Sequence, residues 1–174
     1  LALGQNNVAT TSAAFLEIGA GARSIGMGSA FTAVADDPST LYWNPAGIVY
    51  VTKPEFQTFY SPWLVETQYH YNTAVVPIEG YGNLGLSFTA LTMDDMMVRT
   101  VDIPEPGKYG QKFSAGNIAM GVTFARKLTD RFSFGFKTKF IQETIWQMSA
   151  KGFAIDIGTL YTSSKNLKIG MSIS

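Results

Sequence analysis

The sequence predicts an all-β fold, a transmembrane antiparallel up-and-down β-barrel, on three observations. Charged residues make up 15% of the chain, against about 25% in ordinary soluble domains, which indicates that much of the outer surface does not face water. From residue 54 onward, apolar and polar residues alternate with the two-residue period of a β-strand. Turns of glycine and polar residues separate these segments, and no apolar run approaches the roughly 20 residues that a membrane-spanning helix requires.

Chain length, net charge and cysteine content limit the kinds of protein this sequence can encode. The chain has 174 residues, enough for one domain, and its formal net charge is zero, so no bulk attraction toward nucleic acid is expected. It contains no cysteine, which removes disulfide and thiolate chemistry. Ala2-Leu3-Gly4 before Gln5 has the small-x-small spacing of a signal-peptidase site, and an ordinary flexible terminus is an equally good interpretation.

Residues 13–48, at the front of the chain, lack strand alternation. Asp37-Pro38 is predicted to begin a helical turn, with the aspartate as its cap and the proline at the first helical position. Asn44-Pro45 is predicted to end that turn, because a residue before proline is biased away from the helical conformation.

The next three segments are predicted strands with imperfect alternation, at 54–61, 67–78 and 82–91. The last of them places three apolar side chains on one face: Leu84, Leu86 and Phe88. The middle one is expected to place three more on that same face: Tyr69, Tyr71 and Val75. The first alternates poorly, so its facing stays open.

Four later segments alternate regularly and are predicted strands, at 114–128, 131–143, 151–162 and 167–174. The second of them has four phenylalanines on one face: Phe132, Phe134, Phe136 and Phe140. Its opposite face carries cations. Strands of about ten residues match the roughly 9–11 that cross a bilayer when tilted.

The connections between strands are predicted to differ at the two ends of the sheet. Short turns are expected at 79–83, 128–131 and 163–166, and longer connections at 61–66, 93–112 and 143–151. Outer-membrane barrels have this asymmetry, with short turns on one side of the membrane and long loops on the other.

The polar face decides between two architectures that share this alternation. A soluble lipocalin-like barrel, the alternative, buries its apolar face and shows mixed charge to water. Here the polar face is mostly Gly, Ala, Ser, Thr and Asn, which suits a lumen. The charged residues expected to face that lumen are Arg126, Lys137, Lys139 and Asp156. Aromatic residues near the strand ends, Tyr69 and Tyr71 among them, are expected to form interfacial girdles.

Seven predicted strands after residue 54 are an odd number, which bears on whether they can close a barrel by themselves. Bacterial barrels have an even number of strands, and an open strand edge in hydrocarbon would leave backbone groups unpaired. We therefore expect the wall to continue beyond Ser174, or to be completed by other chains.

Two motifs in the front segment point to a family. AFLEIGAGARSIGMGSAFTAVADD, followed by LYWNPAGI, resembles the N-terminal region of the FadL-like outer-membrane proteins, most closely the PorV/PorQ family. The resemblance implies a 14-stranded barrel, of which this chain is the first half, with an N-terminal plug in the lumen. It divides the chain into a plug segment at 1–53 and a barrel wall at 54–174. It also assigns to the plug the four residues of the NPAG motif: Asn44, Pro45, Ala46 and Gly47.

The charges of the front segment fit a plug that touches the lumen wall. Arg23, Asp36 and Asp37 are expected to pair with lumen charges, because charges in a low-dielectric interior need good partners. The other interpretation is that they solvate a surface loop.

The resemblance implies integral residence in the bacterial outer membrane and two functions. In the first, a plugged channel moves or binds hydrophobic small molecules or secreted protein cargo. In the second, the barrel does not transport, and holds cargo as an interaction partner of a type IX-like secretion system. An apolar landing site, where a hydrophobic substrate would first bind, is expected in the long loop. It is formed by Met93, Met96, Met97, Val98, Val101 and Ile103.

No catalytic or cofactor chemistry is predicted. GAG at 19–21 has Ser24 where a dinucleotide fingerprint requires its third glycine, and no βαβ unit surrounds it. His70 has no second histidine or any cysteine for a metal site, and is expected to face the lumen or lie near a loop. The acidic residues of the long loop lack calcium-ligand spacing. We expect no enzyme activity, cofactor or metal.

Overall fold

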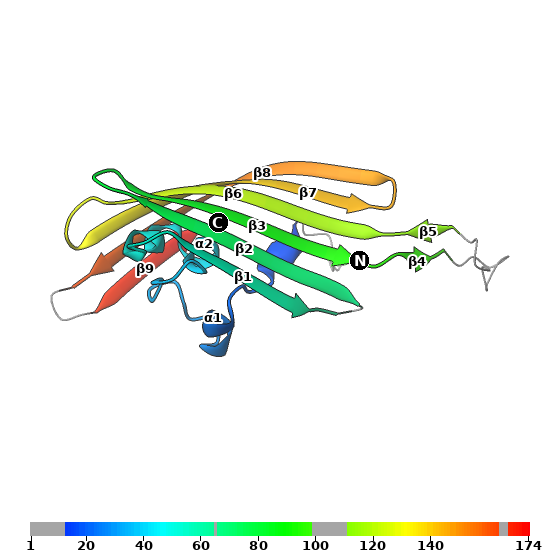
Figure 1. Ribbon diagram of the computed structural model, residues 1–174, viewed down its shortest axis with the longest axis horizontal. Helices are drawn as coiled ribbons and strands as arrows, with labels where there is room; N and C mark the ends of the chain where they lie inside the picture. The colour runs from blue at the N-terminus through cyan, green and yellow to red at the C-terminus, as the bar shows by residue number, and fades with distance from the viewer. Residues whose placement is uncertain (1–12, 65, 99–110, 164–166) are drawn as a thin grey trace, which may run out of the picture.

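The computed structural model describes residues 13–64, 66–98, 111–163 and 167–174. A seven-stranded antiparallel sheet dominates it, in the order β1-β2-β3-β6-β7-β8-β9, and curves into a half-barrel (Figure 1). The predicted seven-strand meander is confirmed. Its strands are β1 (Glu55–Pro62), β2 (Thr67–Ile78), β3 (Gly82–Met93), β6 (Ala115–Lys127), β7 (Phe132–Ile145), β8 (Met148–Thr162) and β9 (Lys168–Ile173).

Two further short strands pair with each other, beyond the last residue of β3 and before the first residue of β6. They are β4 (Met96–Met97) and β5 (Lys112–Phe113), and they extend as an arm from the sheet (Figure 1). The arm was not predicted, because two residues are too few to show a period. Val101 and Ile103 of the expected landing site lie outside the described residues.

One expected long connection is wrong. The stretch 143–151 is a hairpin in which β7 ends at Ile145 and β8 begins at Met148, with Trp146 at a positive φ of 54° in the turn. The sequence concealed this because the outer face, apolar elsewhere, becomes polar there, so the expected alternation fades before the strands end. The outer-face residues of this belt are Gln142, Thr144, Ser149 and Lys151.

The convex face of the sheet is exposed and apolar. One row of side chains in register across four strands is Phe88, Met120, Phe140 and Phe153. A neighbouring row contains Leu84, Phe124, Phe136 and Ile157. Phe153 is 85% exposed and Phe136 is 38% exposed. The sequence-predicted facing of β3, β6, β7, β8 and β9 is therefore correct.

The concave face is covered by the front segment (Figure 1). Its elements are η1 (Ala14–Glu17), α1 (Ala22–Gly26), α2 (Thr40–Trp43) and η2 (Pro45–Tyr50), where η denotes a 3-10 helix. Leu41, Ile48 and Val51 pack on Val75 and Ala125 of the wall in one buried apolar cluster. The main contacts of η2 are with β6, β7 and β8.

The predicted facing of β2 is reversed. Tyr69, Tyr71 and Val75 point into the concave side and are almost fully buried. Tyr69 and Tyr71 pack beside Ala20 of the front segment instead of forming an interfacial girdle. Large apolar side chains on the concave side are needed there because the front segment has its own apolar residues to bury.

The facing of the strands generates a first prediction. Phe136→Lys is expected to lower the free energy of unfolding in lipid vesicles by about 2–4 kcal/mol, because it places a charge on a hydrocarbon-facing position. Gln142→Lys is the matched control, on the same strand and face but within the polar belt. Equal unfolding free energies for the two variants would show that the convex face does not contact hydrocarbon.

Candidate functional site

The NPAG motif begins the segment that sits deepest against the wall. Asn44 is fully buried, ends α2 and caps η2, with its backbone extended at φ −157° and Pro45 at the first helical position. Its side-chain amide donates to the carbonyl oxygens of Thr32, at 2.8 Å, and Thr159, at 3.0 Å. Its Oδ1 accepts from the Ala46 N–H at 3.0 Å. One side chain thus joins a loop, a helix start and strand β8.

Four glycines of the wall lie against the front segment, and two of them, Gly135 and Gly158, lie beneath the motif. We call the four the glycine floor: Gly85, Gly135, Gly158 and Gly170. A Cβ atom at Gly135 would collide with the backbone of Pro45 and Ala46, and one at Gly158 with Asn44 Oδ1 and the Pro45 ring. Glycine inside a strand often marks such an approach by another segment. The floor lets the front segment lie directly on the strands' backbone.

Gly47 of the motif also has no space for a Cβ atom, because other residues of the front segment lie against it. A Cβ at Gly47 would collide with the Thr40 hydroxyl and with Ala35. That hydroxyl donates to the Asn44 carbonyl at 2.8 Å. Asn44 and Pro45, which the resemblance assigned to a plug, therefore lie in the contact layer between front segment and wall, and Gly47 packs tightly within the front segment.

Three of the four expected lumen charges lie on the concave face. Lys139 Nζ and Asp156 Oδ1 form a buried ion pair at 2.8 Å across β7 and β8. Lys137 Nζ donates to the Leu41 carbonyl of α2 at 2.7 Å. Arg126 differs from the expectation, since it is exposed and has the same facing as Phe124 on the convex side.

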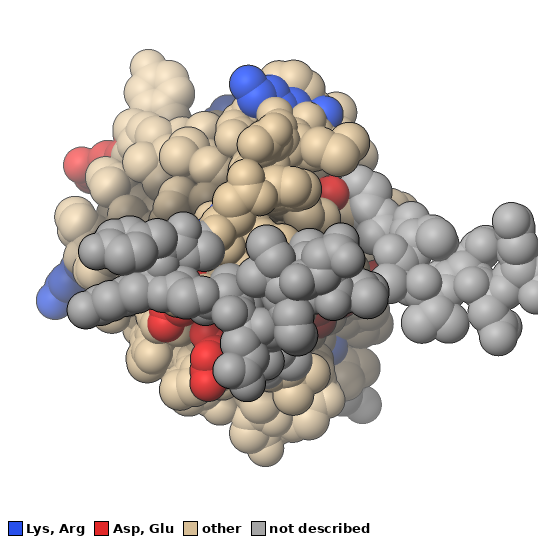
Figure 2. Space-filling view, turned by 90° about the vertical axis from the view of Figure 1, so that its right-hand side faces the viewer, with Lys and Arg blue, Asp and Glu red and all other residues tan. Residues whose placement is uncertain are grey.

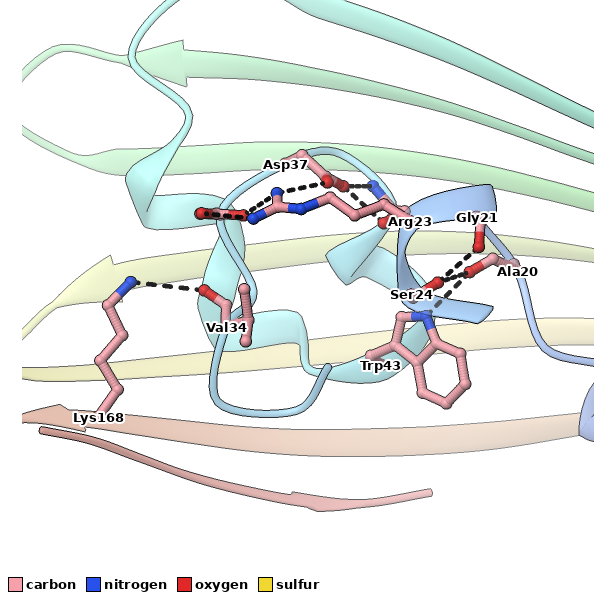
Figure 3. Close-up of polar contacts among 10 residues, drawn as sticks. Ala20, Gly21, Arg23, Ser24, Val34, Asp37, Trp43 and Lys168 are labelled. Atoms are coloured by element: carbon pink, nitrogen blue, oxygen red, sulfur yellow. Dashed lines mark hydrogen bonds and ion pairs between the residues drawn. The ribbon is translucent and has the colours of Figure 1, made fainter. Parts of the chain in front are cut away.

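Arg23, Asp36 and Asp37 pair with one another, not with the wall (Figure 3). Arg23 Nη1 lies 2.6 Å from Asp36 Oδ1 and 3.2 Å from Asp37 Oδ2. The hydrogen bond that Arg23 donates to the Asp36 carboxylate raises the pKa of Arg23 above its ordinary value. Because the side chains are partly exposed, the pair shapes the loop and adds little stability.

Further polar contacts hold the front segment together and to the wall. Trp43 Nε1 donates to the Ala20 carbonyl at 2.9 Å, and Lys168 Nζ of β9 donates to the Val34 carbonyl at 3.4 Å (Figure 3). Lys168 and Lys127 also lie over the Tyr50 ring, at 4.7 and 5.1 Å from its centroid.

Tyr42 of α2 is held in a defined protonation state. Burial, followed by the nearby Glu17 carboxylate, raises the pKa of Tyr42 to about 12. The hydroxyl therefore stays protonated at neutral pH, and it donates to the Leu16 carbonyl at 2.6 Å.

The end of the sheet that carries the arm has a separate feature, which we call the tip platform: Met96, Met97, Ile145, Trp146 and Met148. All five are exposed, from 38% at Met97 to 79% at Met148. The backbone N–H of Trp146 donates to the Ser114 carbonyl at 2.9 Å, which places the β7–β8 turn against the base of the arm. Figure 2 views this end, where the visible described surface is mostly uncharged.

Other sequence expectations resolve as follows. His70 lies on the outer side, stacked near Tyr60 with ring centroids 5.0 Å apart, and does not face the lumen. Among the described residues, no group of three or more His, Asp or Glu side chains is arranged to hold a metal ion. No helix in the described part of the chain has the length and apolarity to span a bilayer.

The sequence predicted a concave face of small residues, but not which of its glycines the front segment would contact. The available signal was that Gly85, Gly135, Gly158 and Gly170 all fall at concave-side positions of otherwise regular strands. Their position on the concave side does not by itself reveal which segment lies against them.

Taken together, an apolar convex face, a small-residue concave face and a segment seated on it define the wall of a membrane-type β-barrel. The family comparison agrees: the model described as "Type IX secretion system protein PorV" matches residues 2–169. The chain therefore belongs to the PorV family. The comparison with curated proteins found no match.

The glycine floor generates a second prediction. Gly158→Ala is expected to cost about 1–3 kcal/mol of unfolding free energy, because the added methyl overlaps Asn44 and Pro45. It should also speed proteolytic cleavage within residues 13–51. Gly152→Ala is the control, on the same strand with open space around its Cβ. Indistinguishable stability and cleavage for the two variants would refute the close contact.

Proposed function

We propose that this chain forms part of an outer-membrane barrel that serves type IX protein secretion by holding a secreted protein at the tip platform. In this proposal residues 13–51 close the lumen as a plug, and the barrel binds cargo instead of conducting it. Family membership supports the link to type IX secretion. The exposed tip platform is the observation that carries the cargo-holding role.

Placement in the membrane is supported by the convex face. An exposed apolar surface that crosses β3, β6, β7, β8 and β9 would aggregate in water and is stable in hydrocarbon. The polar belt on β7 and β8 then marks where the strands leave the hydrocarbon. The hairpin continues past that belt to its turn.

The tip platform is therefore separated from the apolar band. Ile145, Trp146 and Met148 follow the belt residues Gln142 and Lys151 toward the turn. Apolar side chains on the aqueous side of a polar belt are not explained by lipid contact. An exposed Trp and Met surface is typical of a protein-binding site, where such residues supply most of the binding energy.

The closed lumen is supported by the way the front segment is attached. Its contacts with the wall are buried and polar as well as apolar, through Asn44, Lys137 and the glycine floor. Removing them would leave buried groups without partners, at about 1–3 kcal/mol each. Such an attachment favours a fixed plug over a mobile gate.

Transport of hydrophobic molecules is the second candidate. Met96 and Met97 favour it, because two exposed methionines at the base of the long loop offer a soft apolar surface. This route requires the front segment to move, and conductance measurements address that requirement directly.

A third prediction concerns the plug. The full-length protein in planar bilayers is expected to conduct poorly, and deletion of residues 13–51 is expected to open an aqueous path. Asn44→Leu with Pro45→Ala should give an intermediate conductance, because it removes the link to Thr159 and the fixed proline φ. Equal conductance in all three proteins would mean that the segment does not occlude the lumen.

A fourth prediction concerns the tip platform. Trp146→Ser with Met148→Ser is expected to weaken binding of a type IX secreted protein by at least about tenfold, which is ~1.4 kcal/mol. The folded barrel and its single-channel behaviour should not change. Leu128→Ser with Tyr81→Ser is the control, since both residues are exposed and apolar at the opposite end of the sheet. Unchanged binding in the tip variant, measured with purified components, would exclude the platform as the cargo site.

A further inference from the structure

A polar chamber of about 290 Å³ lies between the front segment and the wall, apart from the glycine floor. Tyr42 and Trp43 of α2 line one side of it. The wall side is lined by seven residues of β2, β3, β6 and β7, with Ser172 and Ser174 at the β9 edge of the sheet. The seven are Tyr71, Ser87, Thr89, Ala119, Gly121, Lys137 and Lys139. We propose that this chamber binds a small oxyanion, of the carboxylate or phosphate class.

The chamber is lined by hydrogen-bond donors. Lys137 and Lys139 supply ammonium groups, and Tyr71, Ser87 and Thr89 supply hydroxyls. Among the residues that the structure describes, no aspartate or glutamate side chain lines it. Ammonium and hydroxyl groups can all donate to an anion, whereas a cation finds no carboxylate side chain among the described lining residues.

Charge favours the same ligand class. Asp156 is the carboxylate nearest in the sheet, directly opposite Lys137 in register, and it forms its ion pair with Lys139. The Glu17 carboxylate of the front segment lies near Tyr42, on the other side of the chamber. On the wall strands, two ammonium groups against one carboxylate leave one positive charge. Within a low-dielectric site such a charge is stabilised by an anion that also accepts hydrogen bonds.

The position of Lys137 depends on Gly121. A Cβ at Gly121 would lie 2.6 Å from both Lys137 Cε and Ser87 Oγ, and 3.5 Å from Lys137 Nζ. The lysine side chain therefore passes over the glycine toward β3, where Ser87 faces the same space. Its one hydrogen bond recorded among the described residues goes to the Leu41 carbonyl, which leaves ammonium protons for a ligand.

Tyr71 provides the independent observation. The residue is 2% exposed, its ring packs edge-on to Tyr42 at 5.9 Å, and it lines the chamber. Its hydroxyl makes no hydrogen bond with any described residue. Buried hydroxyls almost always have a partner, and an anion held against Tyr71 in the chamber would supply one for this unpaired hydroxyl.

The test uses the full-length protein in lipid nanodiscs, with inorganic phosphate and acetate as probes in calorimetric titrations. Saturable binding of at least one probe is expected in the wild type. Tyr71→Phe removes only the unpaired hydroxyl and is expected to weaken that binding about tenfold without lowering the unfolding temperature. Tyr60→Phe, the same change on the exposed convex side, is expected to have no effect.

Lys137→Met is expected to abolish binding, with Lys53→Met on the exposed surface as its control. Should Lys137→Met fail to fold, Tyr71→Phe still decides the question, because its hydroxyl supports no contact within the described protein. Absence of saturable binding of both probes in the wild type overturns the proposal. Equal affinity in the wild type and Tyr71→Phe overturns it as well.

Discussion

The close approach of one backbone to another is the constraint on which the structure depends. At the NPAG motif, the chain lies against β7 and β8 with no side chain of Gly135 or Gly158 between them. Asn44 then reaches the Thr159 carbonyl of β8 while it caps its own helix. Larger residues in the floor would push the motif away from the wall and break both sets of contacts.

The two faces of the sheet are shaped by different neighbours. On the convex side, side chains in register are large and apolar, as in the row through Phe88 and Met120. On the concave side, glycine and hydroxyl residues give way to Tyr69, Tyr71 and Val75 where the front segment presents apolar groups. The concave face is thus a fitted surface, polar or apolar according to what covers it.

Charge in the interior follows the same principle of local pairing. Lys139 pairs with Asp156 on the next strand, and Lys137 with a carbonyl of the front segment. At the surface, Arg23 likewise pairs with carboxylates of its own front segment. Short-range partners are favoured because each unpaired charge in a low-dielectric interior costs several kcal/mol.

The sequence by itself determined the seven strands of the large sheet and the facing of five of them, because a two-residue period over lengths such as 114–128 or 151–162 is a property of the local chain. It also identified Asn44, Pro45 and Gly47 through their motif. It did not determine the facing of β2, the hairpin turn at Trp146, the side of Arg126 or the partners of Arg23. Alternation shows that two faces differ, and not which neighbour covers each one. Only the tertiary structure, by seating residues 13–51 on four glycines, decided which side chains are buried together.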